Sequence, residues 1–322
     1  MKIIGIGNAL VDVLVRLKDE TTLKELQLQR GGMELIDDNR QQQISAMLSE
    51  LNPEMATGGS AGNAILALAN LGAMPGFIGR VGSDQMGEFF RQNCEKKGID
   101  ARLEQGEGAT GVANTFISAD GERTFATFLG EAALVDISHI TPDTFKGYDV
   151  LHIEGYLVTN HNFIEHVMKT AKQCGLKISI DLASYNVVNA DLDFFRHLVS
   201  NYVDIVFANE EESAAFTEGK NPEEALEEIA GMCEVAIVKL GKHGSSVMSG
   251  TEKHVVSATP VDNVLDTTAA GDFFAGGFLY GYANGFPLER CLECGSLLSS
   301  KVIQVIGTQV SEETWEEIRR TL

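Results

Sequence analysis

The stretch Asp266-Thr267-Thr268-Ala269-Ala270-Gly271-Asp272 separates two segments of different character. The β-branched run at 255–258 before it is typical of a strand. Apolar residues follow it at helical spacing: Phe274, Phe278, Leu279 and Tyr282. The sequence therefore predicts a strand, a turn of small residues and a helix. The small side chains at 269–271 leave the first N–H groups of that helix uncovered, and such groups can bind an anion with the help of the helix dipole.

Asp272 lies at the start of the predicted helix, where its own charge would oppose a bound anion. A carboxylate at that position is useful if it accepts a proton beside a phosphoryl group in transfer. Alternatively, Asp272 is only the N-cap of the helix, and the small residues only allow close packing. The local pattern leaves both interpretations open.

Length, charge and composition narrow the class of protein. The 322 residues suffice for one large α/β domain, and 44% of them are hydrophobic. The net charge of −21 argues against a nucleic acid or an anionic membrane as partner, because both require a basic surface. The absence of a long apolar run or signal peptide, together with five scattered cysteines, leads us to expect a cytoplasmic protein with reduced thiols. Cys291 and Cys294 form a lone C-x-x-C pair, for which we expect no metal.

The order of strands and helices predicts the fold class. From residue 147 on, strand and helix patterns alternate, which indicates an α/β fold with a doubly wound, mostly parallel sheet and helices on both faces. The segments near 11–17, 32–36, 111–118 and 123–129 alternate instead like strands of a small antiparallel sheet, with a hairpin signal at Asp120-Gly121. We therefore expect a single domain, 1–322, with a small β lid formed by about 11–36 and 109–130.

The stretch at 266–272 resembles the Asp-Thr-x-Gly-Ala-Gly-Asp signature of the ribokinase-like, or PfkB-type, carbohydrate and nucleoside kinases. The resemblance implies that Asp272 is the catalytic base. It also implies that the N–H groups of Ala269, Ala270, Gly271 and Asp272 form an anion hole for the γ-phosphoryl group. Ala269 departs from the family, which usually has Gly there. A positive φ at that position would cost Ala about 1 kcal/mol.

A second resemblance lies near the N-terminus. Gly58-Gly59-x-x-x-Asn63 and the glycine-rich run 78–87 are similar to the N-terminal signature of the same family, in which the Gly-Gly pair and the Asn contact the substrate. Asn63 alone would more often be a helix cap. Asp12 is implied to bind the sugar hydroxyls, the alternative being a solvated lid residue. The opening Gly-Asn-x-x-x-Asp resembles that of adenosine kinases somewhat more than that of ribokinases.

Two further residues are candidates for substrate contact. Arg123 lies in the predicted lid hairpin, where a mobile cation can reach the phosphate or the substrate, although exposed lid arginines are usually only solvated. Glu154 follows the strand at 150–153, and ligands in such sheets bind at the carboxyl ends of the strands.

The candidate ATP and Mg²⁺ site follows from the same resemblance. Asn209-x-x-Glu212 resembles a family pattern that orders Mg²⁺ and phosphates through water, which implies that Glu212 belongs to the outer shell of the metal and that Asn209 contacts a phosphate or a water of the metal. The acidic run 210–212 can equally complement a helix dipole. The turn at 239–244 and Thr267 would border ATP through Lys239, Gly241 and Gly244. The family often has Thr or Ser at position 239.

Together the two signatures imply an ATP- and Mg²⁺-dependent kinase that acts on a hydroxyl of a small molecule. Adenosine or a related nucleoside is the first candidate substrate, and a free sugar such as ribose or fructose is the alternative. A non-catalytic sugar- or nucleotide-binding regulator is an alternative of another class, against which the presence of Asp272 and Glu212 argues. An activating monovalent cation and a homodimer paired through the lid edge are left open.

Overall fold

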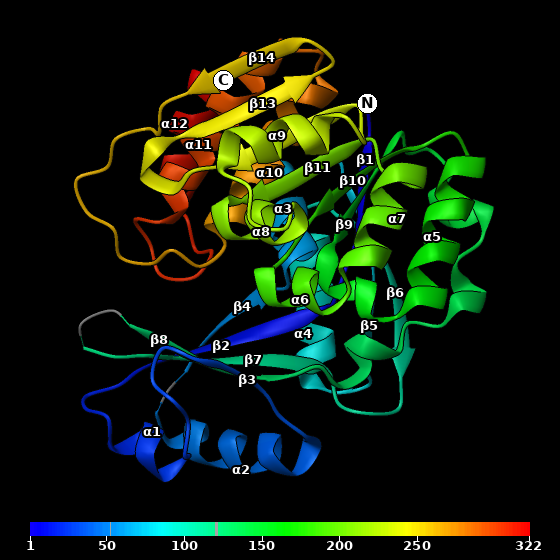
Figure 1. Ribbon diagram of the computed structural model, residues 1–322. Coiled ribbons are helices and arrows are strands. Elements are labelled where there is room, and N and C mark those ends of the chain that lie inside the picture. The colour runs from blue at the N-terminus through cyan, green and yellow to red at the C-terminus, as the bar shows by residue number, and fades with distance from the viewer. Residues whose placement is uncertain (52, 120–121) are drawn as a thin grey trace.

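A nine-stranded sheet forms the centre of the computed structural model, which describes residues 1–51, 53–119 and 122–322. Its strand order is β14-β13-β12-β11-β10-β9-β1-β5-β6 (Figure 1). The strands are β1 (Ile3–Ile6), β5 (Gly76–Gly82), β6 (Asp100–Gly106), β9 (Val150–Glu154), β10 (Lys177–Asp181), β11 (Ile205–Asn209), β12 (Val235–Lys239), β13 (Ser245–Ser249) and β14 (Glu252–Val256). All pairings from β6 to β12 are parallel, and only β13 and β14 pair in antiparallel fashion. The predicted, mostly parallel sheet is confirmed.

Helices cover both faces of this sheet, as Figure 1 shows. One face carries α3 (Ser60–Asn70), α4 (Gln85–Lys96), α10 (Ala270–Ala283) and α11 (Leu288–Val302), with α12 (Glu312–Thr321) packed behind them. The other carries α5 (His161–Gln173), α6 (Tyr185–Ala190), α7 (Leu192–Tyr202), α8 (Glu210–Phe216) and α9 (Pro222–Ala230). On β11, Phe207 belongs to the first core and Val206 to the second, as the alternation of a doubly covered strand requires.

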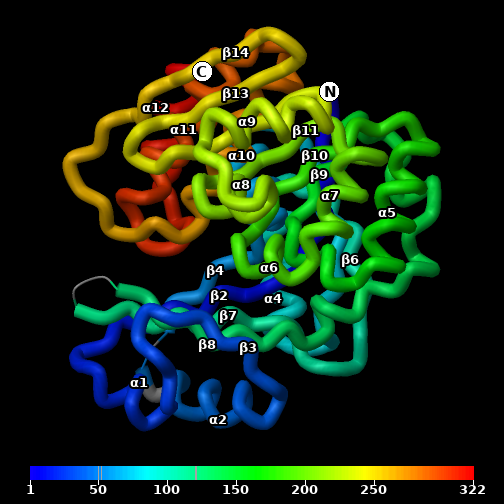
Figure 2. The backbone as a smooth tube through the Cα atoms, in the orientation of Figure 1, coloured from blue at the N-terminus to red at the C-terminus, as the bar shows by residue number. Residues whose placement is uncertain are grey.

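A second, five-stranded sheet has the order β3-β8-β7-β2-β4. Its strands are β2 (Leu10–Arg16), β3 (Met33–Leu35), β4 (Glu54–Gly58), β7 (Gly111–Ile117) and β8 (Arg123–Phe128). The helices α1 (Thr21–Glu25) and α2 (Asp38–Leu48) lie on its side away from the large sheet (Figure 2). The side chain of Asn114 on β7 donates to that of Gln41 on α2 at 2.6 Å.

The small sheet differs from the prediction in its pairing. β2 pairs with β4 and β7 with β8 in antiparallel fashion, but β2–β7 and β3–β8 are parallel. The expectation of an antiparallel sheet is therefore wrong for two of its four pairings. Between β2 and β7 in sequence the chain forms β5 and β6 of the large sheet. The two strands are therefore not joined by a hairpin turn, which would impose an antiparallel arrangement. The predicted hairpin turn at Asp120-Gly121 lies outside the described residues.

Two strands have no clear signal in the sequence. β4 ends in small residues that are typical of a loop, and β6 is polar because it forms an edge of the large sheet.

The small sheet has β4 at one edge and β3 at the other. In β3, Met33 is 58% exposed and Leu35 is 62% exposed. That this edge pairs two copies of the chain stays a prediction.

None of the helices in the described ranges is long and apolar enough to cross a membrane. Short 3-10 turns lie at Ser49–Leu51, Gly130–Leu134, Ile137–His139, Pro142–Phe145, Gly155–Thr159 and Gly241–His243.

The turn before α10 has a left-handed residue at Ala269, with φ 59° and ψ 5°. The condition under which Ala is less favourable than Gly is therefore met. Ala269 is buried in an apolar cluster that also contains Phe273 and Leu71, and burial of its methyl group offsets about 0.8 kcal/mol of the strain. Packing thus explains how an alanine is tolerated at a position that favours glycine.

Replacing Ala269 by Gly removes the strain together with the buried methyl group. We expect the free energy of unfolding of Ala269→Gly to stay within about 1 kcal/mol of the wild type. The matched control Ala275→Gly removes a fully buried methyl group from the right-handed interior of α10 and should cost about 2 kcal/mol. Denaturant unfolding measures both values. Equal losses in the two variants would show that residue 269 is not strained.

Candidate active site

Asp272 lies in the first turn of α10 and faces the N-terminus of α3. Its Oδ1 accepts a hydrogen bond from Ser60 Oγ at 2.8 Å, and its Oδ2 accepts one from Asn63 Nδ2 at 2.9 Å. Each oxygen of the carboxylate is therefore bound by a side chain of α3, a helix that is distant in sequence. The remaining polar atom of Asn63, its buried Oδ1, has no hydrogen-bond partner among the described residues.

The protonation of Asp272 is shifted toward neutral pH. Burial raises its pKa to about 6, and the hydrogen bonds from Asn63 and Ser60 limit the rise because they favour the charged form. Near neutral pH the group is largely ionised and has a pKa suited to accepting a proton. This arrangement fits a base better than a simple N-cap, because no hydrogen bond within the described residues links the carboxylate to its own helix.

The turn before α10 is fixed by Asp266. Its Oδ1 accepts from the N–H of Thr268 at 2.8 Å, and its Oδ2 accepts from the N–H of Gly307 at 2.6 Å. The N–H of Ala270 donates to the carbonyl of Thr267 at 3.2 Å, so this donor is partly used inside the turn. Thr267 itself is exposed. The first N–H groups of α10 are directed along the helix axis toward the region in front of this turn.

Lys239 ends β12 beside the same turn. Its Nζ lies 2.7 Å from Asp181 Oδ2, at the end of β10, and 3.1 Å from where a Cβ on Gly271 would be. Burial alone would lower the pKa of Lys239, but the charges of Asp181 and Glu212 outweigh burial and raise it. The ammonium group is therefore firmly charged.

Asn209 and Glu212 form a capping box at the start of α8. The N–H and the Nδ2 of Asn209 donate to the two oxygens of Glu212, each at 2.7 Å, and Asn209 Oδ1 accepts from the N–H of Glu212 at 2.8 Å. Burial, followed by the charge of Asp181, raises the pKa of Glu212 to about 7. Among the described residues no group of three His, Cys, Asp or Glu side chains can hold a metal ion. Glu212 and Asp181 offer carboxylate oxygens, the ligand type that Mg²⁺ prefers.

Asp12 reaches the same region from the small sheet. Burial, followed by the charge of Asp272, raises the pKa of Asp12 to about 7, and Arg123 counteracts the rise. A Cβ on Gly58 would lie 2.1 Å from Asp12 Oδ1, and Gly59 has φ 85° with a Cβ position 2.2 Å from the carbonyl of Asn8. Gly58 thus allows the close approach of β4 to Asp12 on β2, and Gly59 allows the start of α3 to approach the segment before β2.

Glu154 lies beneath the site. Its carboxylate accepts from the N–H and the Nδ2 of Asn8 at 2.9 and 2.5 Å, and from the N–H of Ala61 at 3.0 Å. Burial raises the pKa of Glu154 to about 7, against the effect of these donors. These donors hold Glu154 against Asn8 and the start of α3, which supports a role in positioning α3. Its contact with substrate stays a prediction.

Arg123 is buried, which contradicts the expectation of a mobile or merely solvated lid arginine. Its guanidinium group pairs with Asp266 and donates to Thr268 Oγ1 at 2.8 Å. The charge of Asp266 explains why it is buried. Arg123 Nε is buried without a hydrogen-bond partner in the described residues. The small sheet is thereby connected directly to the turn before α10.

The two glycines predicted near ATP both have positive φ. Gly241 has φ 53°, and Gly244 has φ 99° with a Cβ position only 2.0 Å from the carbonyl of Val256.

Two residues of the site, Ser60 and Asp181, were not among those predicted from the sequence. Ser60 lies inside the Gly-Gly…Asn motif, and Asp181 ends a strand, as the recognised candidates do.

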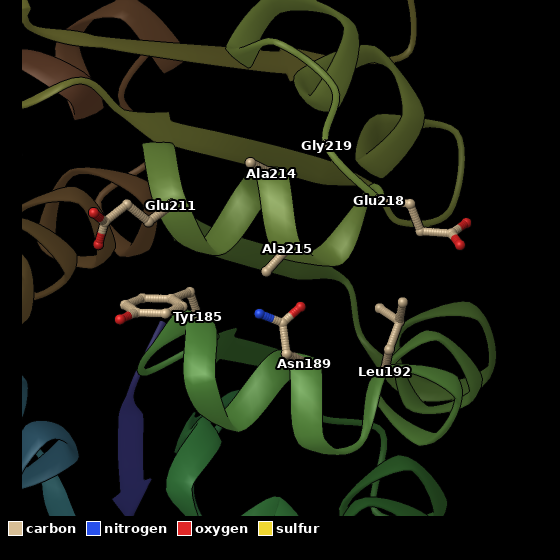
Figure 3. A pocket seen from close by; sticks show the side chains of 8 residues that line it. All are labelled: Tyr185, Asn189, Leu192, Glu211, Ala214, Ala215, Glu218 and Gly219. Carbon is tan, nitrogen blue, oxygen red and sulfur yellow. The ribbon is translucent and has the colours of Figure 1, made fainter.

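A pocket of about 390 Å³ lies between α6 and α8, where Figure 3 shows Tyr185 and Asn189 facing Ala215. Its charged lining residues, Glu211 and Glu218, are both acidic, so this pocket is unsuited to phosphate groups.

The C-x-x-C cysteines, Cys291 and Cys294, are buried in α11 as free thiols.

Known proteins share both this sequence pattern and this fold. Residues 33–315 match the model of the pfkB family of carbohydrate kinases. The structure is similar to a probable sugar kinase from Rhizobium etli, with 32% identity, a TM-score of 0.89, and coverage of 99% of this chain and 98% of that one. The adenosine kinase from Sinorhizobium meliloti is 33% identical, with a TM-score of 0.88 and coverage of 100% and 99%. The 5-dehydro-2-deoxygluconokinase from Bacillus subtilis is 26% identical, over 90% of this chain and 94% of that protein.

The two donors from α3 should control the pKa of Asp272. Because each hydrogen bond favours the carboxylate, we expect Asn63→Ala and Ser60→Ala each to raise that pKa above about 6. Titration of the carboxyl carbon by NMR measures the change. Asn70→Ala is the matched control on α3, because the Asn70 side chain contacts Leu66 and Lys97 instead. An unchanged pKa in both test variants would refute the role of the donors.

Proposed function

Because the chain belongs to the pfkB family of carbohydrate kinases, we propose that it uses ATP and Mg²⁺ to phosphorylate a primary hydroxyl of adenosine or a related nucleoside. Family membership makes it a phosphotransferase that acts on a hydroxyl group of a sugar or nucleoside. The observation that carries the proposal is the buried carboxylate of Asp272, which two side chains of α3 hold at the N-terminus of α10.

In the proposed reaction Asp272 is the general base. It accepts the proton of the acceptor hydroxyl while that oxygen forms a bond to the γ-phosphorus and the bond to the ADP oxygen breaks. The N–H groups of Ala269, Ala270, Gly271 and Asp272 hold the oxygens of the transferring group. For Ala270 this means exchanging its 3.2 Å bond with Thr267 for one with phosphate. Fixed donors of this kind stabilise charge where it develops.

The acceptor would be held between the two sheets. Asp12 accepts hydrogen bonds from the sugar diol, and the unpartnered Oδ1 of Asn63 accepts another. Gly58 and Gly59 allow the backbone to approach the sugar. Arg123 connects the small sheet to the phosphate turn, and we propose that this sheet, formed from about 11–36 and 109–130 together with β4, acts as a lid that limits water.

ATP would lie along the ends of β11 and β12, bordered by Asn209, Gly241, Gly244 and Thr267. Glu212 and Asn209 would hold Mg²⁺ through its water shell, and the ion, when bound, offsets part of the phosphate charge. Activation by a monovalent cation stays a prediction.

Two observations favour a nucleoside over a charged sugar. The chain is 33% identical to an adenosine kinase over its whole length. In addition, Arg123, the buried cation whose charge acts on Asp12, already pairs with Asp266, which favours an uncharged acceptor over a sugar acid. A free sugar is the second candidate, because the chain is also 32% identical to a probable sugar kinase.

Turnover of ATP with Mg²⁺ on a panel of adenosine, inosine, ribose, fructose and 5-dehydro-2-deoxygluconate tests the proposal. We expect the highest kcat/KM with a nucleoside. Asp272→Asn should lower kcat about 10²- to 10⁴-fold, because it removes the base but keeps the size of the side chain.

The other outcomes distinguish the alternatives. Turnover with free sugars alone would keep the mechanism but exclude the proposed substrate. Binding of nucleotide without turnover on any acceptor would favour the non-catalytic regulator. Full activity of Asp272→Asn would exclude Asp272 as the base.

A further inference from the structure

The ammonium group of Lys239 lies against the phosphate turn. Its Nζ is 3.1 Å from the position that a Cβ would take on Gly271, so a side chain at 271 would press against the ammonium group. The Lys239 side chain is only 14% exposed, and Asp181, its partner at 2.7 Å, is 7% exposed. An ammonium group has three N–H donors, and Asp181 accepts the one hydrogen bond recorded from Nζ within the described residues.

Acidic groups surround this cation. Asp181, Glu212 and Asp272 all act on the charge of Lys239. Three carboxylates facing one cation would repel the phosphate group of a nucleotide, so the orientation of that cation matters for binding. Asp181 accepts one N–H of the ammonium group close to the turn, and the other two N–H groups have no recorded partner among the described residues.

We propose that Lys239 is a catalytic residue that donates a hydrogen bond to the transferring γ-phosphoryl group, and that Asp181 is the residue that positions it. The inference rests on the proposed function and deepens it, because it assigns the contact with this phosphate to one side chain. A role confined to joining the ends of β10 and β12 is the competing explanation for the same ion pair.

The affinities for ADP and for β,γ-imido-ATP, measured by calorimetry without acceptor, distinguish the two explanations. A contact with the γ-phosphoryl group strengthens only the binding of the triphosphate. We expect Lys239→Met to lower the ratio Kd(ADP)/Kd(imido-ATP) about 10- to 100-fold, as the loss of a charged hydrogen bond requires. The control Lys172→Met breaks the ion pair with Asp204, which lies just before the first residue of β11 and so at the other end of the strands from Lys239; it should leave the ratio unchanged.

Lys239→Met leaves Asp181 buried without its cation and can impair folding. The double variant Lys239→Met, Asp181→Asn removes both charges and should show the same lowered ratio. Asp181→Asn alone should lower the ratio and kcat. Within the Lys239→Met background it should have no further effect on the ratio, because Asp181 acts through Lys239.

Each result decides the proposal. A ratio that Lys239→Met and the double variant leave unchanged, with wild-type turnover intact, overturns the inference and keeps the proposed function. Equal effects of Asp181→Asn in the presence and absence of Lys239 overturn the positioning role. A wild-type protein that binds neither nucleotide refutes the proposed function, and the inference with it.

Discussion

The contact of Asp272 with Ser60 and Asn63 is the interaction on which the site depends. It joins the N-termini of α3 and α10, which are about two hundred residues apart in sequence. The two helices can approach this closely because Gly276 of α10 has no side chain. A Cβ at that position would lie only 2.8 Å from the carbonyl oxygen of Ala64 on α3. Glu154 fixes the start of α3 through the N–H of Ala61. The position of the Asp272 carboxylate therefore follows from the packing of α3 against α10. It does not depend on the conformation of the surrounding loops.

Charge is the second constraint, because the site gathers more acids than bases. Burial raises the pKa of Asp12, Glu154 and Glu212 to about 7 and that of Asp272 to about 6. The two buried cations, Lys239 and Arg123, each pair with an aspartate. A site of this kind can hold phosphate only where cations and backbone N–H groups face it directly. The turn before α10, with Lys239 beside Gly271 and Arg123 bound to Thr268, is such a place.

The sequence was sufficient to predict the parallel sheet and the position of Asp272, because both follow from local patterns. Strand and helix periodicity repeats along the chain, and the small-residue turn at 266–272 identifies the helix start by itself. Features that depend on tertiary contacts were not predictable in the same way. The burial of Arg123 results from its pairing with Asp266, which is far away in sequence, and the parallel pairing of β2 with β7 results from the path of the chain through the large sheet. Likewise, nothing local shows that Asp181 meets Lys239 or that the oxygens of Glu154 are already occupied.

The central claim is that Asp272 accepts the proton, and the pH dependence of kcat/KM tests it most directly. This profile reports ionisation of the free enzyme, so activity should fall tenfold per pH unit below about pH 6. Asp12, Glu154 and Glu212 also titrate in this region, each with a pKa of about 7, so the profiles of Asp12→Asn, Glu154→Gln and Glu212→Gln are needed beside that of the wild type. We predict that the acidic limb persists in all three variants. A limb that disappears in any of them, or a wild-type profile that stays flat down to pH 5, would contradict the assignment of Asp272 as the base.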